Sequence, residues 1–396
     1  MDLTITPRSL AGNIKIIPSK SVAHRMLICA AFSDRETDIS CASISKDIAA
    51  TIGCLQALGA QITYSSGCIR VIPSKCIPEQ VDLFCFESAS TLRFLLPVVG
   101  ALGVNANFHL DGRLPQRPLA PLSQEMERMG CVLSRQENNI LCCTGKLRKG
   151  HYSIDGSVSS QFVTGLMLGL ALMEEDCSLT VTGKIESAPY IAITRQVLSS
   201  FGLQNDIYGG QPLRSPGSLE VEGDWSNAAF FLTANALGSR CAVEGLSENS
   251  AQGDKVVASI LEALNKGHIM VDCSDIPDLI PVLSVAAAYF HGAEFINVSR
   301  LRLKESDRIE GICKMLNCLG IQVNIDANTF TVFPGTISGG TVDSLCDHRI
   351  AMSAAIAATV ASDKVTILNA DCVIKSYPDF WAEYARLGGI YEQHLG

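Results

Sequence analysis

The chain has 396 residues and a formal net charge of −9, with 47% hydrophobic and 18% charged residues. This length suits two or three domains with a sizeable core. The acidic balance argues against a general nucleic-acid binder or a protein of acidic membrane surfaces. An anionic ligand would therefore need a local cluster of positive side chains. No apolar run approaches the ~18 residues that a membrane span needs.

The sequence has 16 cysteines and seven histidines. It has no Cys-x-x-Cys or His-x-x-x-His spacing, so we expect no metal site. Cysteines such as Cys29, Cys54 and Cys177 lie in apolar runs, which predicts buried thiols in a reducing cytoplasm. The first seven residues show no basic stretch followed by an apolar core, so we expect neither a signal nor a transit peptide.

The first element in chain order is a strand, a tight corner and a helix between residues 14 and 31. Lys20 and Ser21 stand at the corner, in Pro-Ser-Lys-Ser-Val-Ala-His-Arg, where backbone N–H groups are still unpaired. Arg25 lies one helical turn after Ser21 and faces the same way. Together these groups suit an anion, phosphate above all. A capped helix with a solvated Lys20 and Arg25 fits this segment equally well.

A repeat of about 66 residues divides the chain into six parts. Helices rich in small apolar residues are expected to start near Ser21, Ser90, Ser160, Asn227, Asp278 and His348. Second, amphipathic helices are expected to end at glycines that act as left-handed caps, namely Gly59, Gly130, Gly202, Gly267, Gly320 and Gly388. Most of these glycines precede two short strands joined by a turn, as in residues 60–72 and 320–333.

Each repeat therefore reads strand, helix, strand, helix, strand, strand. The first helices are apolar nearly all round, so we expect them to be buried, with the second helices outside. The expected buried helices of the fourth and fifth repeats start only 51 residues apart, near Asn227 and Asp278. A polar Gly-rich segment, 209–217, precedes the helix near Asn227. We expect a break near residue 224 and an α/β protein of two lobes with a cleft between them. A large mixed α/β protein with accidental glycine spacing is the alternative.

Polar residues gather at the starts of the expected buried helices beyond what capping needs. Besides Lys20 and Ser21, the clusters are Ser90-Thr91 with Arg93, Ser159-Ser160-Gln161, Asp278, and Asp347-His348-Arg349. Connecting segments add Arg117, Lys304, Arg308 and Lys375, each of which alone reads as a solvated surface charge. Asp278 and Glu305 are carboxylates among these cations and can accept a proton from a positioned substrate group. Two such groups suit a reaction that moves two protons.

These motifs closely resemble those of the 5-enolpyruvylshikimate-3-phosphate synthase (EPSP synthase) family. The matching segments are residues 18–25, 87–93, 116–118, 155–161, 187–190, 276–278, 303–308, 347–349 and 375–379. The resemblance implies a two-lobed inside-out α/β barrel with three βαβαββ repeats per lobe. It places lobe one at residues 1–14 plus 225–396 and lobe two at 15–224, with the active site in the cleft between them.

The resemblance implies transfer of the enolpyruvyl group of phosphoenolpyruvate to the 5-hydroxyl of shikimate 3-phosphate, with release of phosphate, through a tetrahedral intermediate. It gives catalytic roles to Lys20, Asp278 and Glu305. The residues implied to bind shikimate 3-phosphate are Lys20, Ser21, Arg25, Ser159, Ser160, Gln161, Ser187, Tyr190, Asp278, Arg300 and Lys304. Those implied to bind phosphoenolpyruvate are Lys20, Ala89, Arg93, Arg117, Gln161, Arg308, His348, Arg349 and Lys375. The resemblance implies no metal or organic cofactor, no nucleic-acid or membrane partner, and a cytoplasmic monomer.

Three residues depart from the family pattern. Glu87 stands where many members carry Asn, Ala89 where a glycine is usual, and Arg300 where some members use Asn to contact substrate. The methyl group of Ala89 is expected to crowd the inhibitor glyphosate, which is longer than phosphoenolpyruvate. Two alternatives remain. One is the sister family that acts on UDP-N-acetylglucosamine, whose usual loop cysteine is missing from residues 111–118. The other is a catalytically inactive anion-binding scaffold.

Overall fold

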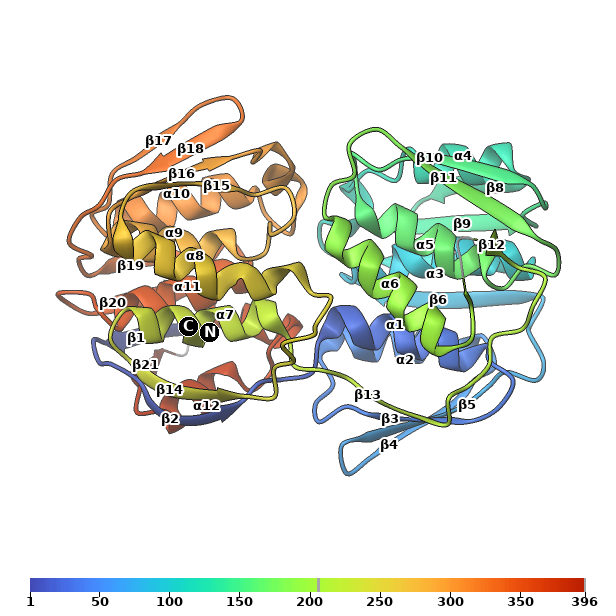
Figure 1. Cartoon of the computed structure of the whole chain (residues 1–396), viewed down its shortest axis with the longest axis horizontal. Helices are drawn as coiled ribbons and strands as arrows, with labels where there is room; N and C mark the ends of the chain where they lie inside the picture. Colours follow the sequence, from blue (N-terminus) through green and yellow to red (C-terminus); the bar gives the residue numbers. More distant parts are fainter. Residues whose placement is uncertain (205–206, 395–396) are drawn as a thin grey trace. The chain divides into compact units, whose positions relative to one another are not determined.

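The chain crosses twice between two separately packed units. The computed structural model describes residues 1–204 and 207–394. Unit 1 comprises Met1–Ile17 and Gly223–Gly396, and unit 2 comprises Pro18–Glu222. The lobe boundaries expected from the sequence, after residues 14 and 224, lie within a few residues of these two crossings. Each unit has its own buried helices and its own sheets (Figure 1).

Three helices of unit 2 are buried along nearly their whole length, as the sequence predicts. They are α1 (Lys20–Ala31), α3 (Ala89–Leu102) and α5 (Ser160–Leu170). Helices α3 and α5 approach closely because α5 carries two glycines. An ideal Cβ on Gly165 would lie 2.1 Å from the carbonyl oxygen of Arg93, and one on Gly169 would lie 2.7 Å from that of Pro97. A side chain at either position would push the helices apart.

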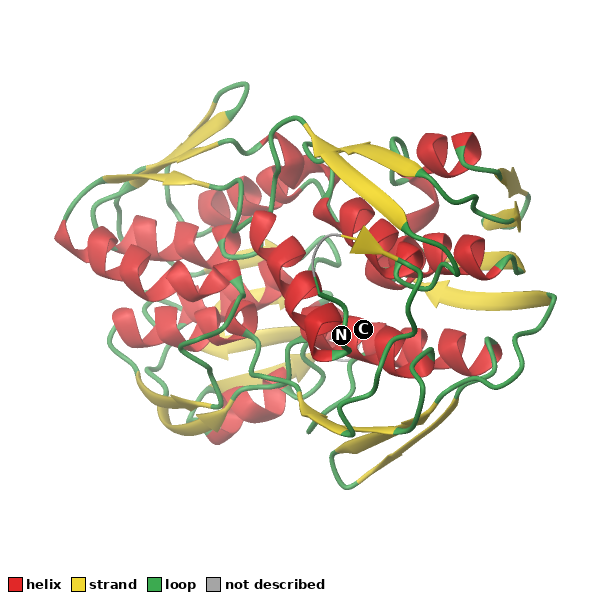
Figure 2. Cartoon of the chain, turned by 45° about the vertical axis from the view of Figure 1, so that its right-hand side comes forward, coloured by secondary structure: helices red, strands yellow, loops and turns green. Residues whose placement is uncertain are grey.

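Strands and amphipathic helices lie outside the buried helices of unit 2 (Figure 2). The outer helices are α2 (Lys46–Ala57), α4 (Leu122–Arg128) and α6 (Ala188–Ser200). The strands are β3 (Thr37–Ser40), β4 (Gln61–Ser65), β5 (Cys68–Ile72), β6 (Gln80–Phe86), β7 (Asn105–Leu110), β8 (Cys131–Gln136), β9 (Ile140–Gly145), β10 (His151–Asp155), β11 (Cys177–Thr182), β12 (Ile207–Tyr208) and β13 (Ser218–Glu220). They form sheets in the orders β13-β3-β5-β4, β6-β7-β9-β8 and β10-β11-β12. Burial alternates along β6, so one sheet face packs inward.

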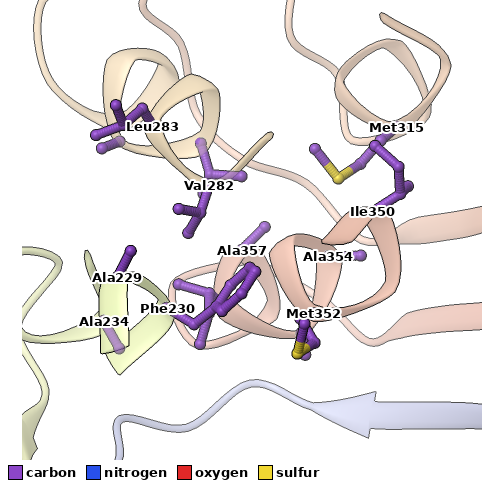
Figure 3. Close-up of a cluster of buried hydrophobic side chains, with 14 of the residues drawn as sticks. Ala229, Phe230, Ala234, Val282, Leu283, Met315, Ile350, Met352, Ala354 and Ala357 are labelled. Atoms are coloured by element: carbon purple, nitrogen blue, oxygen red, sulfur yellow. The ribbon is translucent and has the colours of Figure 1, made fainter. Parts of the chain in front are cut away.

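The core of unit 1 is also built on three buried helices. They are α7 (Trp225–Ala236), α9 (Ile280–Tyr289) and α11 (His348–Ala358). All eleven residues of α11 are buried. Side chains of the three helices, among them Phe230, Val282 and Ala357, gather in one cluster (Figure 3). The many alanines of α11 leave room for its neighbours to pack closely.

The sheets of unit 1 join both ends of the chain. The outer helices are α8 (Val257–Lys266), α10 (Arg308–Cys318) and α12 (Phe380–Arg386). The strands are β1 (Asp2–Thr6), β2 (Ala11–Lys15), β14 (Arg240–Glu244), β15 (Ile269–Asp272), β16 (Ala293–Ile296), β17 (Val323–Ile325), β18 (Thr329–Val332), β19 (Gly340–Asp343), β20 (Val365–Leu368) and β21 (Ile390–His394). Their orders are β15-β16-β18-β17, β19-β20-β1-β21 and β14-β2. The N-terminal strand β1 thus lies between β20 and β21.

The element order follows the predicted repeat in part. Apart from short 3₁₀ turns, residues 80–145 and 269–332 each read strand, helix, strand, helix, strand, strand, and their sheets share one strand order. The fourth repeat does not complete this pattern, because α8 leads directly to β15 without a hairpin. Strand β2 pairs with β14, while β13 takes the place beside β3. The two crossings of the chain therefore exchange strands between repeats.

Five of the six predicted glycine caps have the left-handed backbone that favours glycine. The φ angles of Gly59, Gly130, Gly202, Gly320 and Gly388 lie between +80° and +115°. Gly267 has a φ of 169°, which is extended backbone, so the prediction of a left-handed cap there is wrong. The chain leaves α8 in an extended conformation and enters β15 two residues later.

Two further observations concern membranes and thiols. Within the described residues, no helix has the length and apolar character needed to cross a membrane. Cys29, Cys54 and Cys177 are buried free thiols, as the sequence predicts.

Candidate active site

In unit 1, three of the predicted site residues, Asp278, His348 and Arg349, lie at the N-terminal ends of buried helices. Asp278 lies in the turn before α9, and Arg349 is in the first turn of α11. Arg349 donates hydrogen bonds to the Asp278 carboxylate and to the hydroxyl of Ser226 in the first turn of α7. Asp224 and Asp347 are the N-caps of α7 and α11, and each accepts a backbone N–H of its own helix. One hydrogen-bonded network therefore joins three helix starts.

Asp278 is the centre of this network. Its Oδ1 accepts from Arg308 Nη1 at 2.8 Å, and its Oδ2 accepts from Arg349 Nη2 at 3.0 Å. Lys304 Nζ lies 3.9 Å from Oδ1. Burial alone would raise the pKa of Asp278, but the charges of Arg349, Lys304 and Arg308 outweigh it and hold the pKa well below its usual range. The carboxylate is therefore ionised, and it becomes a useful base only when some of these cations turn to another anion.

Arg308 is more fully occupied than the sequence suggests. It is 1% exposed and donates to three carboxylates: Asp278, Glu305 at 2.6 Å and Asp347 at 3.1 Å. Burial opposes its charge, yet Asp347, Glu305 and Asp278 raise its pKa further. This guanidinium therefore lies among three acidic partners, while Asp278 lies among cations as the sequence analysis expects. An anionic ligand of Arg308 would have to share it with these carboxylates.

Lys304 is the cation of the network whose charge is easiest to lose. Burial, aided by the charges of Arg308 and Arg300, lowers its pKa to about 8, although Asp278 and Glu305 act in the opposite direction. Arg300 is half-buried in the 3₁₀ helix η3 (Ser299–Leu303). Lys304 can therefore change its charge within a pH range that assays reach.

One acidic residue of this region was missed by the sequence analysis. Asp254 lies in the 3₁₀ helix η2 (Gly253–Val256) and is 4% exposed. Burial, aided by the charge of Asp278, raises its pKa to about 8 although the charges of Arg349 and Lys304 act in the opposite direction. No motif marks Asp254, because the fold brings it to the network from a turn that resembles any other polar turn.

In unit 2, Lys20 and Arg25 have different surroundings. Lys20, the first residue of α1, forms an ion pair with Asp47 at 2.8 Å. Arg25 is 1% exposed, and it donates to Thr194 at 2.8 Å, Thr164 at 3.1 Å and carbonyl oxygens of α1 and α6. Burial lowers the pKa of Arg25 to about 9. The guanidinium therefore ties three helices together in addition to any contact with an anion.

Arg93 and Gln161 form the second pair in unit 2. Arg93 Nη1 donates to Gln161 Oε1 at 2.7 Å, and its Nη2 donates to the carbonyl oxygen of Pro118 at 3.1 Å. Gln161 Nε2 donates to Ser90 Oγ at 3.0 Å. The guanidinium also lies 4.9 Å from the centre of the Phe162 ring. The predicted starts of α3 and α5 are thus joined by side chains.

The remaining predicted residues occupy helix starts or turns. Ser159 caps α5 and accepts the backbone N–H of Gln161, and Ser160 is the first residue of that helix. Ser187 precedes α6 with a φ of +56° and is 2% exposed. Ala89 opens α3 at 7% exposure. The others are Ser21, which is half-buried in α1; Tyr190, half-buried in α6; Arg117, half-buried after the 3₁₀ helix η1 (Leu114–Gln116); His348, buried at the start of α11; and Lys375, half-buried at the end of the 3₁₀ helix η4 (Ala370–Lys375).

No group of three or more His, Cys, Asp or Glu side chains is placed to hold a metal ion in residues 1–204 and 207–394. The networks instead offer guanidinium, ammonium, hydroxyl and carboxamide groups. Such groups bind carboxylates and phosphates, and the carboxylates among them can exchange protons.

Comparison with known proteins agrees with this chemistry. A sequence model described as EPSP synthase (3-phosphoshikimate 1-carboxyvinyltransferase) matches residues 5–384. The chain belongs to this family. A curated EPSP synthase relative from Clostridium kluyveri, named 3-phosphoshikimate 1-carboxyvinyltransferase, is 36% identical over 99% of this chain and 98% of its own length. A relative of the same name from Clostridium perfringens is 38% identical over 98% of both chains.

Solved structures share the fold. An EPSP synthase from Acinetobacter baumannii has a TM-score of 0.80 at 22% identity, covering 99% of this chain and all of its own. The enolpyruvyl transferase NikO from Streptomyces tendae has a TM-score of 0.78 at 17% identity, covering all of this chain and 99% of its own. The mixed α/β fold is therefore that of the EPSP synthases over the whole chain.

Proposed function

We propose that this chain transfers the enolpyruvyl group of phosphoenolpyruvate to the 5-hydroxyl of shikimate 3-phosphate and releases phosphate. The activity is that of a 3-phosphoshikimate 1-carboxyvinyltransferase in the shikimate pathway to chorismate and the aromatic amino acids. The observation that carries the proposal is Asp278, a carboxylate in contact with Arg308 and Arg349 and close to Lys304, in a chain that matches the family from end to end.

The proposal assigns each substrate to the residues named from the sequence. Unit 2 supplies most of the groups for shikimate 3-phosphate, including Lys20, Ser160 and Gln161, while Lys304 belongs to unit 1. The residues proposed to bind phosphoenolpyruvate include Arg93 of unit 2 and Arg349 of unit 1. We propose that the units are the two lobes of an inside-out α/β barrel fold, built from βαβαββ repeats, and that both sets face one cleft. A monomeric cytoplasmic enzyme without cofactor completes this proposal.

The network of unit 1 suggests how Asp278 gains basicity. Phosphoenolpyruvate carries a carboxylate and a phosphate, and both compete with Asp278 for the donors of Arg308 and Arg349. Each hydrogen bond given to the substrate weakens the cationic field on Asp278, so its pKa rises toward a value that suits proton transfer. Substrate binding would thus switch on the base.

The reaction then moves two protons in two steps. In the addition, the 5-hydroxyl oxygen bonds to the central carbon of phosphoenolpyruvate, Asp278 takes the hydroxyl proton and the methylene carbon receives a proton from Glu305. In the elimination, the methyl carbon returns a proton to Glu305, the double bond re-forms, the carbon–oxygen bond to phosphate breaks, and Asp278 gives its proton to the leaving phosphate. The cations stabilise the charge that collects on the leaving phosphate.

The two alternatives make different predictions in one assay. Phosphate release from phosphoenolpyruvate is measured alone, with shikimate 3-phosphate and with UDP-N-acetylglucosamine. Release only with shikimate 3-phosphate supports the proposal, and release with the nucleotide sugar supports the sister activity. Absence of release with either acceptor, at substrate concentrations shown to bind, would indicate a scaffold. Adding glyphosate to the active reaction, for the native chain and for Ala89→Gly, tests whether the Ala89 methyl reduces inhibition.

A further inference from the structure

Arg349 is held from two sides within unit 1. Toward α9, its Nη2 donates to Asp278 Oδ2 at 3.0 Å and its Nη1 donates to the Asp278 carbonyl oxygen at 3.2 Å. Toward α7, its Nη2 donates to Ser226 Oγ at 3.0 Å. The donor directions of a guanidinium are fixed in one plane, so anchors on two sides determine how that plane is turned.

The hydroxyl group of Ser226 has one possible arrangement in this network. It donates to Asp224 Oδ1 at 2.6 Å, and the same oxygen accepts the backbone N–H of Asn227 at 2.9 Å as the cap of α7. A guanidinium can only donate, so Ser226 Oγ accepts from Arg349 while its own proton goes to Asp224. Asp224, Ser226 and Arg349 are each at most 6% exposed, so water does not readily replace a lost bond.

Arg308, the other arginine that contacts Asp278, bonds to the cap of a buried helix without an intervening hydroxyl group. Arg308 Nε donates directly to Asp347 Oδ2 at 3.1 Å, and Ser306 Oγ donates to the same oxygen at 3.0 Å. Both arginines are thus connected to the capping aspartate of a buried helix. Arg308 reaches its aspartate directly, whereas Arg349 reaches Asp224 through one hydroxyl group.

We propose that Ser226 is a positioning residue that fixes the guanidinium of Arg349 for binding of phosphoenolpyruvate. This inference rests on the proposed function, which assigns Arg349 to that substrate. Ser226 acts through Arg349 and itself contacts neither substrate. The link to the α7 cap, together with the bonds to Asp278, fixes the plane of the guanidinium, so its donors are already oriented when phosphoenolpyruvate binds.

The test is Ser226→Ala. Loss of the hydroxyl leaves a buried donor of Arg349 and a buried oxygen of Asp224 without this partner. We expect the KM for phosphoenolpyruvate to rise about tenfold, the scale of a hydrogen bond to a charged group. The KM for shikimate 3-phosphate should stay within about twofold of the native value, because no residue assigned to that substrate bonds to Ser226. Steady-state kinetics with each substrate varied in turn measures both constants.

Two serine variants serve as controls. Ser353→Ala makes the same chemical change at a fully buried position of α11, where the hydroxyl has no hydrogen-bond partner among the described residues. It should leave both KM values unchanged. Ser226→Thr keeps the hydroxyl and should restore most of the affinity for phosphoenolpyruvate. Thermal unfolding of each variant shows that the fold is retained.

Asp224→Asn gives an independent reading if Ser226→Ala does not fold. Asparagine still caps a helix but removes the charge that holds the Ser226 proton. It should raise the KM for phosphoenolpyruvate several-fold and leave that for shikimate 3-phosphate unchanged.

Arg349→Lys separates this inference from the proposed function. If Arg349→Lys raises the KM for phosphoenolpyruvate while folded Ser226→Ala and Asp224→Asn leave it within twofold, the positioning role is overturned and the proposed function stands. An equal rise in both KM values for Ser226→Ala also overturns the role, since that is the result of a general structural defect. If Arg349→Lys leaves the KM unchanged, the assignment of Arg349 to the donor is itself wrong.

Discussion

At the scale of single residues, Asp278 combines two properties that are usually separate. Two arginines contact its carboxylate, which is the environment of a structural ion pair, yet it lies at a helix start with 21% of its side chain exposed. If the carboxylate were purely structural, its replacement by an amide would lower the free energy of unfolding and leave turnover nearly unchanged. If it were the catalytic base, the replacement would lower turnover and leave the free energy of unfolding nearly unchanged. A single substitution therefore distinguishes the two roles.

We expect Asp278→Asn to cut turnover by roughly a hundredfold or more, the scale of a lost general base. The fold should persist because Arg308 keeps its bonds to Glu305 and Asp347. Turnover and the binding of both substrates are measured beside Asp275→Asn, a nearby exposed control. Near-native turnover with intact binding would remove Asp278 from the mechanism.

Lys304 gives a prediction about pH. Its pKa of about 8 means that the ammonium is charged below pH 8 and neutral above it. Because the charged form is the one that attracts phosphate, kcat/KM for shikimate 3-phosphate should fall about tenfold per pH unit above pH 8. In Lys304→Arg the side chain stays charged, so the fall should move to higher pH even if the absolute rate is lower.

Asp254→Asn is the control for that profile, since Asp254 also has a pKa of about 8. If kcat/KM still falls at the same alkaline pH in Lys304→Arg, and this fall is lost in Asp254→Asn, the titrating group is Asp254 and not Lys304.

At the scale of secondary-structure elements, the sequence predicts the positions of the helices better than it predicts which distant residues and strands contact one another. Apolar runs that begin near Ser, Asn, Asp or His predicted all six buried helices, because burial and capping are local properties. Neighbours such as Ser226 and Asp254 could not be found this way, since polar turns far apart in sequence meet only in the folded chain. The family resemblance placed residues 1–14 in lobe one, but the pairing of β2 with β14 and of β13 with β3 was not predicted for the same reason.

The contact between α3 and α5 gives an element-scale prediction. A methyl group at position 165 would lie 2.1 Å from the backbone oxygen of Arg93, so the helices must separate. We expect Gly165→Ala to lower the free energy of unfolding by about 1–3 kcal/mol or more. Arg93 lies at this contact, so its bond to Gln161 and the affinity for phosphoenolpyruvate should weaken as well.

The matched control for this contact is Gly53→Ala in α2, where a Cβ would meet nothing within 4 Å. That variant should gain up to about 1 kcal/mol from helix propensity alone. Urea unfolding of both variants measures the difference. Equal effects of the same sign at the two positions would show that close helix packing does not explain the glycine at 165.

At the scale of the whole molecule, the proposed residues for each substrate are divided between two units joined by two chain crossings. Anionic substrates gain most when cations of both units reach them at once. Binding of shikimate 3-phosphate should therefore shift the population toward a closed form. A fully compact chain of 396 residues has a radius of gyration of about 21 Å. Small-angle scattering should give a larger value for the free enzyme and a decrease toward this value with shikimate 3-phosphate.

Shikimate, which lacks the phosphate, is the control ligand for closure. It offers the ring hydroxyls and the carboxylate, but it lacks the phosphate charge that Lys20, Lys304, Ser159 and Ser160 are proposed to hold. At concentrations that saturate binding, it should produce a smaller decrease in the radius of gyration than shikimate 3-phosphate does. A radius that stays constant with both ligands would show that the units do not close on this substrate. An equal decrease with both would show that the phosphate does not drive closure, and the assignment of these cations to it would have to be revised.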